Sequence, residues 1–491
     1  MWTLRNVRAL VLLATIGLTA CAAVQHQTHV VVEHQLRAKQ PQAALKTLEQ
    51  QPVSAKQSAL YYLNKAMVLR QLDNYQASIE TFEQAKNVIG RLSPTSITGS
   101  LAAYTITEQF NNYQASTFDR LFVHIYQIMN YLALNKLDSA RVEAMQIDLA
   151  LNRLTEENLY QEAASARYIT GLVFEANQEP DNAFIAYQHA FNNYQRANVH
   201  IPHDLQHRLK SLSHRLGVDL GLTLSESFVA QEEETMPPSL PHGQIVVLAD
   251  IDFAPRLTMV DTTVVNPDNG NIVRVSIPKY QSRMLERMDV RLSLKPKRIA
   301  TANTTVENTA PASTVTESAD AESTDPESTD PESSAPKNTS PEITAPEITA
   351  SGITAQEKNI AAEDLANIEA IAMEELDRKM PTIIARTISR NISKNAIANQ
   401  VSEENQILGQ LVSIVGAALE QADTRSWLTL PNKLQIASQS LAQGNYQLQV
   451  EVLDRSGHVV HQKTIDSIEV APNQLTFVNF SWQKPYTHAL H

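Results

Sequence analysis

Small and aromatic residues recur at helical spacing between residues 30 and 220, and this pattern constrains the fold more than any other feature. The clearest unit contains Gly171, Phe174, Ala183, Tyr187 and Ala190. Apolar residues three and four positions apart lie on one face of a helix, and small residues let two helices approach closely. The pattern therefore predicts antiparallel helical hairpins over residues 30–220.

These offsets resemble the tetratricopeptide pattern, in which an aromatic side chain fills the space between two helices. A second unit contains Tyr62, Ala66, Leu69, Tyr75, Ser78, Phe82 and Ala85, a weaker third contains Ala133, Ala140, Ala144 and Ile147, and a degenerate first contains Ala44 and Leu48. Only the interval from 44 to 78 equals the regular period of about 34 residues. We therefore expect a tetratricopeptide-like α-solenoid with insertions.

Stacks of this kind present a concave surface to a peptide or protein. Asn130, Tyr131 and Glu143 are the candidate binding residues in that groove. The alternative is an ordinary surface position without a function for each of them.

The N-terminus has the order that a secretory signal peptide requires. Arg5 and Arg8 precede an apolar run that ends in Leu18-Thr19-Ala20-Cys21. These last residues resemble the lipobox of bacterial lipoproteins, in which the cysteine is lipidated and becomes the first mature residue. The resemblance implies cleavage between Ala20 and Cys21 and an acyl anchor on Cys21. The alternative is an ordinary signal peptide with a chance cysteine.

The residue after the cysteine indicates a location. In lipoproteins of Gram-negative bacteria an aspartate at that position tends to retain the protein at the inner membrane, and here the residue is Ala22. The resemblance therefore implies lipid anchoring at the outer membrane, on its periplasmic face.

Composition and motifs exclude several classes of function. Cys21 is the only cysteine, so a lipidated chain has no thiol for disulfides, catalysis or metal binding. The net charge of −13 gives no reason to expect nucleic acid as a partner. The sequence has no nucleophile elbow, P-loop or nucleotide-binding glycine motif. We expect a protein that is not an enzyme and has no cofactor, although paired carboxylates for glycan cleavage stay open because the fold sets their spacing.

Four histidines lie close together in the sequence: His200, His203, His207 and His214. His203 and His207 are four residues apart and would share one face of a helix. However, no HExxH motif or carboxylate occurs at the usual ligand spacing. Pro202 indicates a helix start, with Asp204 as a cap or first-turn acid. We therefore expect no metal site here.

Alternating apolar residues predict strands in the second half. Residues 244–249 form an apolar run typical of a buried strand, and 257–265 with 271–277 predict a hairpin. Residues 446–452, 459–470 and 475–482 predict an antiparallel meander.

Eight segments follow from these patterns. They are a lipoprotein signal peptide (1–20), a lipidated tether (21–29), tetratricopeptide-like repeats (30–220), a linker (221–242), a β-rich part of the C-terminal domain (243–299), a disordered insertion rich in Ser, Thr, Pro and Glu (300–356), a helical part (357–421) and a β-rich C-terminal part (422–488). The predicted fold class is α+β multidomain, with an N-terminal α-solenoid and a discontinuous α+β domain of antiparallel, sandwich-like strands.

Three stretches resemble an uncharacterised family of proteobacterial outer-membrane lipoproteins with tetratricopeptide-like repeats. They are Phe118–Tyr131, Asp252–Pro255 and Ala422–Pro431, of which the last is the most specific. The resemblance covers most of the mature chain but not residues 300–356. It implies location and architecture, and lipoproteins of this kind look similar in role to accessories of envelope assembly.

The Asp423–Trp427 stretch is the best candidate site in the sequence. Asp423 and Arg425 form a candidate ion pair, and Trp427 offers a flat face to a sugar ring or to a partner's side chain. The alternative places Trp427 in a helix–sheet junction, with Asp423 and Arg425 as a cap and a salt bridge.

These inferences predict a lipid-anchored, periplasm-facing adaptor or scaffold in cell-envelope assembly. Its expected partners are the membrane, through the N-terminal lipid, and periplasmic or outer-membrane proteins, with peptidoglycan as a further candidate. Two alternatives stay open: a glycan-binding or glycan-cleaving lipoprotein, and a pilotin-like secretion or export factor.

Overall fold

The computed structural model describes residues 28, 30–91, 113–153, 159–220, 242–265, 272–297, 358–404 and 422–486. The predicted signal peptide with Ala20 and Cys21, most of the predicted linker and the predicted insertion at 300–356 lie outside these residues. The described chain forms helices first and then mainly strands, so the predicted α+β class is confirmed.

Helices fill the first half of the chain. They are a helix over residues 30–37, α2 (Pro41–Glu49), α3 (Ser58–Gln71), α4 (Tyr75–Arg91), α5 (Thr117–Ala133), α6 (Leu137–Arg153), α7 (Tyr160–Ala176), α8 (Pro180–Arg196) and α9 (His203–Leu216). Helices α3 and α4, α5 and α6, and α7 and α8 pack against each other in consecutive pairs. Short turns join the two helices of each pair, as in αα-hairpins.

The turns of the three hairpins share one geometry. Asp73, Asn135 and Gln178 each follow the first helix of a pair and have positive φ angles of 54°, 52° and 60°. In each turn the next backbone N–H donates to the carbonyl five residues earlier, at 2.8–3.0 Å. This is the Schellman pattern that ends helices at a left-handed residue. The first helix of each of the three hairpins therefore ends in the same way.

The hairpin of α7 and α8 depends on a glycine. A Cβ atom at Gly171 would lie 2.3 Å from the ring of Tyr187, so only glycine allows this approach. We expect Gly171→Ala to lower the free energy of unfolding by about 1–3 kcal/mol, since overpacking forces a shift of the ring. Gly90→Ala in α4 is the matched control because nothing lies within 4 Å of its Cβ position. Urea unfolding followed by circular dichroism measures the stability of both variants. Equal midpoints for the two would contradict a close contact between Gly171 and Tyr187.

Strands dominate the second half. They are β1 (His242–Ile251), β2 (Arg256–Val265), β3 (Ile272–Gln281), β4 (Asp289–Pro296), β5 (Lys358–Ala361), β6 (Glu363–Asn367), β7 (Lys433–Ala442), β8 (Gly444–Leu453), β9 (Val459–Val470) and β10 (Leu475–Trp482), with helix α11 (Ile368–Glu404) between β6 and β7. One sheet has the order β10-β1-β7-β6 and another β5-β4-β8-β9, while β2 and β3 form a separate hairpin. The predicted β2–β3 hairpin is therefore confirmed.

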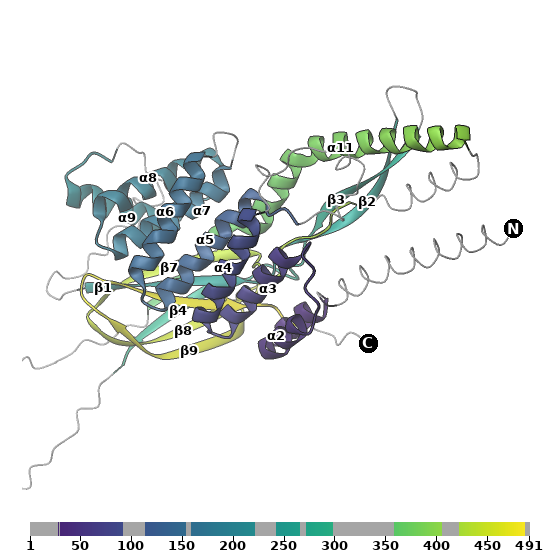
Figure 1. The fold of residues 1–491 in the computed structure, drawn as a ribbon. Coiled ribbons are helices and arrows are strands. Elements are labelled where there is room, and N and C mark those ends of the chain that lie inside the picture. Colours follow the sequence, from purple (N-terminus) through teal and green to yellow (C-terminus); the bar gives the residue numbers. More distant parts are fainter. Residues whose placement is uncertain are drawn as a thin grey trace, which may run out of the picture.

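Strand β1 lies at the centre of three layers (Figure 1). Val246 and Leu248 belong to the core shared with the helices, whereas Ile245 and Val247 belong to the core between the two four-stranded sheets. A strand buried on both faces has a nearly continuous apolar sequence, which is what residues 244–249 show. The inner face of the helical hairpins is consequently covered by the chain's own sheet.

Two predictions about the second half were wrong. β8 and β9 pair as predicted, but β10 leaves their sheet and pairs in parallel with β1, so residues 446–482 do not form one meander. The predicted helical part begins with the strands β5 and β6 before α11. Periodicity locates strands but does not choose their partners.

Helix α11 and the β2–β3 hairpin run side by side away from the body of the molecule (Figure 1). Pro381 lies inside α11, where it removes one backbone donor. None of the helices in the described part of the chain has the length and apolarity needed to cross a bilayer.

Candidate functional site

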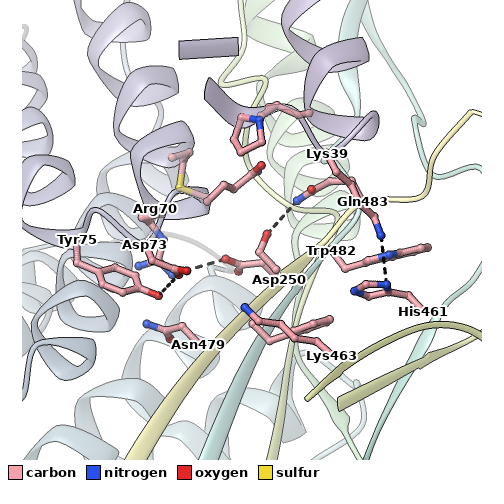
Figure 2. Close-up of a pocket in the computed structure, with 16 residues that line it drawn as sticks. Lys39, Arg70, Asp73, Tyr75, Asp250, His461, Lys463, Asn479, Trp482 and Gln483 are labelled. Atoms are coloured by element: carbon pink, nitrogen blue, oxygen red, sulfur yellow. Dashed lines mark hydrogen bonds and ion pairs between the residues drawn. The ribbon is translucent and has the colours of Figure 1, made fainter. Parts of the chain in front are cut away.

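A polar cavity of about 220 Å³ lies where α3 and the start of α4 meet β1, β9 and β10. Figure 2 shows its lining, which mixes charged and aromatic side chains: Lys39, Arg70, Asp73, Tyr75, Asp250, His461, Lys463, Asn479, Trp482 and Gln483. We call this space the seam cavity because it lies between the helical layer and the sheets.

The inner wall of the seam cavity is a buried ion pair. Arg70 Nη2 lies 3.6 Å from Asp250 Oδ2, and the Tyr126 hydroxyl donates to Asp250 Oδ1 at 3.0 Å. Burial raises the pKa of Asp250, although the positive charge of Arg70 opposes this shift. The guanidinium also donates to Asn130. This network joins α3 and α5 to β1, so we assign it to holding the layers together.

Lys39, His461 and Lys463 lie on the solvent side of the seam cavity, which we call its mouth. Lys39 Nζ lies 3.2 Å from His461 Nδ1, and the His461 ring stacks on Trp482 with centroids 6.1 Å apart. Burial and the charges of Lys39 and Lys463 lower the pKa of His461. A neutral imidazole beside two ammonium groups leaves net positive charge at the mouth. Because Asp73 and Asp250 also line the cavity, it offers both cationic and anionic groups to a small polar molecule.

On the opposite wall Tyr75 donates to Asp73 Oδ1 at 2.9 Å, as Figure 2 shows. Burial raises the pKa of Tyr75 to about 12, so the phenol stays protonated at neutral pH. The Tyr75 hydroxyl therefore keeps its hydrogen, which it can donate to Asp73 or to a ligand in the place of Asp73.

A second cavity, of about 170 Å³, is lined by the predicted 423–427 stretch. The other lining side chains come from the segment before α5, from α5, from the β1–β2 connection and β2, from β3 and from α11, and include Tyr113, Asp119, Tyr280, Glu375 and Lys379. We call it the motif cavity. Asp423 Oδ2 lies 2.6 Å from Arg425 Nη2, which confirms the predicted ion pair.

Trp427 lies in the wall of the motif cavity and is only 2% exposed. Its ring packs edge-on against Phe82 and Tyr126, with centroids 5.9 and 6.2 Å apart. Its Nε1–H has no hydrogen-bond partner within the described residues. The tryptophan therefore fills a helix–sheet junction, as the structural alternative predicted, and presents no open face to solvent.

Buried acids also line the motif cavity. The Tyr113 hydroxyl donates to Asp119 Oδ2 at 2.6 Å. Burial raises the pKa of Asp119, and the nearby charge of Glu375 adds to this increase. The motif cavity thus combines two tyrosines and two acidic side chains, which are groups that bind sugars and other polyhydroxylated molecules.

The predicted groove residues do not line an open groove. Asn130 is fully buried and donates to Ser78 Oγ at 3.0 Å, and Tyr131 is half-buried against the core. Glu143 is 5% exposed; burial opposes its ionisation, but His124 and Lys86 bind its two oxygens and lower its pKa. The groove prediction was wrong for Asn130 and Glu143, because side chains of the neighbouring helices α3, α4 and α5 pair with them.

Sequence reasoning missed the seam cavity altogether. Arg70 ends α3 among buried residues, and Asp250 interrupts the apolar run of β1. A charge inside an apolar segment usually has a buried partner, and this was the available signal. Arg70 and Asp250 lie in different halves of the chain, so local patterns cannot assign one to the other.

Glu162 on α7 predicts a dependence of stability on pH. Its side chain is fully buried 3.1 Å from Arg378 Nη2, and burial raises its pKa from 4.5 to about 7. The folded state holds the proton of the Glu162 carboxyl more tightly than the unfolded state does. The contribution of this proton to the free energy of unfolding is therefore fully present below about pH 4.5, and it is lost as pH rises through about 7. We expect Glu162→Gln to raise the unfolding temperature more at pH 8 than at pH 5. An equal or larger gain at pH 5 would contradict the assignment.

Comparisons with protein-family models, with curated proteins and with solved structures gave no match to this chain. The functional argument therefore depends on the residues and their geometry.

Proposed function

We propose that this chain is a lipid-anchored adaptor that binds a partner protein through the outer face of a tetratricopeptide-like solenoid. The repeated turns at Asp73, Asn135 and Gln178 support the solenoid assignment, since each closes a hairpin in the same way. The lipobox-like sequence around Cys21 supports the anchor and the periplasmic face of the outer membrane.

An apolar stripe on α6 is the observation that carries the adaptor proposal. Val142, Met145 and Leu149 are 55%, 49% and 43% exposed and lie at positions i, i+3 and i+7. They lie opposite the buried face of Ala140, Ala144 and Ile147. Three exposed apolar side chains on one helix face are typical of a surface that binds protein, and methionine adapts its shape to a partner.

The stripe replaces the concave groove as the proposed binding surface. Sheet residues occupy the inner face of the hairpins, and Asn479 on β10 donates to the Met129 carbonyl at 3.0 Å. A partner protein with an apolar helix face or strand edge is the occupant that fits the outer surface of α6.

Charge substitutions test the stripe. We expect Met145→Glu combined with Leu149→Lys to reduce recovery of the partner at least tenfold in affinity purification from crosslinked cells, because each charge would have to be desolvated in the interface. Glu80→Lys on the exposed side of α4 is the control and retains the partner. Recovery of the same proteins with both variants would overturn the proposal, as would recovery of this chain alone, which would indicate a homo-oligomer.

The lipid anchor has its own test. We expect Cys21→Ala to abolish labelling with a fatty-acid analogue and to release the protein from the membrane fraction. Unchanged labelling and membrane association would contradict the anchor without affecting the stripe.

The motif cavity favours a second candidate function, the binding of a glycan such as peptidoglycan. The specific observation is a cavity lined by two tyrosines, Tyr113 and Tyr280, and by two acidic side chains, Asp119 and Glu375. We expect Glu375→Gln to reduce cosedimentation with purified peptidoglycan several-fold, because it removes a charged lining group. Glu374→Gln is the matched control, since Glu374 is the preceding residue on α11 and is not among the residues that line the motif cavity. Failure of the unmodified protein to sediment, or equal loss in both variants, would exclude this role for the motif cavity.

A further inference from the structure

Two histidines and a glutamate from distant segments meet at the outer edge of the sheet. His200 lies in the connection between α8 and α9, His203 begins α9, and Glu363 begins β6. His200 Nε2 lies 2.9 Å and His203 Nδ1 lies 2.5 Å from the same oxygen, Glu363 Oε1. One donor atom from each residue lies within 4.8 Å of the other two.

The carboxylate of this cluster is held in place by the backbone. Glu363 Oε2 accepts a hydrogen bond from the His203 N–H at 2.7 Å, which leaves Oε1 directed at both imidazoles. The imidazole ring centroids are 5.5 Å apart and the ring planes are inclined by 56°. Both rings therefore present a nitrogen to one point without stacking on each other.

We propose that His200, His203 and Glu363 bind a divalent transition-metal ion, with Zn²⁺ as the first candidate. Two imidazole nitrogens and one carboxylate oxygen form a donor set that zinc commonly accepts, with a water completing the tetrahedron. Ligand atoms about 2.05 Å from zinc are separated by roughly 3.3 Å in a tetrahedron. The observed separations of 2.5 and 2.9 Å need to widen only slightly to reach that spacing.

The exposure of the cluster allows the ion to enter. The His200 side chain is 57% exposed, His203 28% and Glu363 23%. The His200 ring has room to shift because more than half of it lies in solvent. Solvent also has access to the fourth coordination position.

The location of the cluster gives the ion a structural consequence. Tyr194 on α8 donates to the Leu365 carbonyl on β6 at 2.6 Å, so the cluster lies beside an existing contact between the helices and the sheet. Zinc would cross-link the α8–α9 connection to β6 and stabilise the folded state in proportion to its occupancy. The sequence-based argument against a metal site considered carboxylates near the histidines in the sequence, whereas this carboxylate comes from β6, far beyond His203 in the chain.

Zinc titration of the tag-free, full-length protein after chelator treatment tests the site. We expect calorimetry to show a zinc site and zinc to raise the unfolding temperature. His200→Ala removes a mainly exposed ligand without disturbing the core, and we expect it and Glu363→Gln each to weaken zinc binding about tenfold or more and to remove the thermal shift.

His214→Asn is the control, because His214 lies in the last turn of α9, outside the cluster. It retains the affinity and the thermal shift of the unmodified protein. Absence of zinc binding by the unmodified protein would overturn the proposal. The same affinity and thermal shift in His200→Ala as in His214→Asn would also overturn it, since binding would then come from other surface groups.

Discussion

Replacement of Arg37 by alanine is expected to lower the free energy of unfolding by about 3–5 kcal/mol, because it leaves a buried carboxylate without its partner. Arg37 is 1% exposed, and its Nη1 lies 2.7 Å from Oδ1 of Asp252, which is fully buried. Burial raises the pKa of Asp252 even in the presence of Arg37. Without the guanidinium of Arg37, keeping the charged Asp252 carboxylate buried would cost more free energy.

Arg37 also joins segments that are far apart in the sequence. It donates to the carbonyls of Lys484 at 2.8 Å and Arg283 at 2.9 Å, and it lies 5.0 Å from the centroid of the Phe253 ring. The substitution would thus remove contacts of the helix over residues 30–37 with the segment after β1, with Arg283 and with Lys484 at once.

Urea unfolding followed by circular dichroism measures this effect. Arg291→Ala is the control, since Arg291 pairs with Glu451 at 2.6 Å but its side chain is 36% exposed. We expect that control to lose no more than about 1 kcal/mol, because solvent screens exposed ion pairs. Similar midpoints for Arg37→Ala and Arg291→Ala would contradict the assigned role of Arg37.

Replacement of Trp427 by alanine is the second large effect that we expect. Removal of a buried tryptophan typically costs about 3–5 kcal/mol, through lost transfer energy and the cavity that remains. The indole joins Phe82 on α4 and Tyr126 on α5 to the segment that leads into β7. The cavity would therefore open between the helices and the sheet.

Trp427→Phe provides the comparison because it keeps an aromatic ring in the same space. We expect its thermal unfolding temperature to lie much closer to that of the unmodified protein than to that of Trp427→Ala. A Trp427→Ala protein that unfolds at the unmodified temperature would show that Trp427 does not fill this junction.

The sequence predicted contacts between residues that are close in the chain, but not contacts between residues that are far apart in it. Gly171 and Tyr187 are neighbours within one hairpin, so their spacing predicted the α7–α8 pair correctly. The apolar run of β1 likewise predicted a buried strand. By contrast, the parallel pairing of β1 with β10 joins the first and the last strand of the described chain. The local periodicity of a strand does not predict which other strand it pairs with.

The candidate sites show the same difference between pairs that are close in the sequence and pairs that are far apart. Asp423 and Arg425 are close neighbours in the sequence, and their predicted ion pair is present. Arg70 and Asp250 come from α3 and β1, in different halves of the chain, and no local pattern joins them. Asn130 was expected in a groove because repeat stacks usually have an open inner face, but it is buried against Arg70 on α3 and Ser78 on α4, more than 50 residues earlier in the chain.

A photocrosslinking residue at position 145, followed by mass spectrometry, tests the adaptor proposal most directly. Position 145 lies within the exposed stripe of α6, and position 80 on α4 serves as the exposed control. We predict a covalent adduct with one envelope protein in living cells from position 145 and none from position 80. Adducts of equal yield at both positions, or no adduct at position 145, would contradict the proposal that α6 binds a partner.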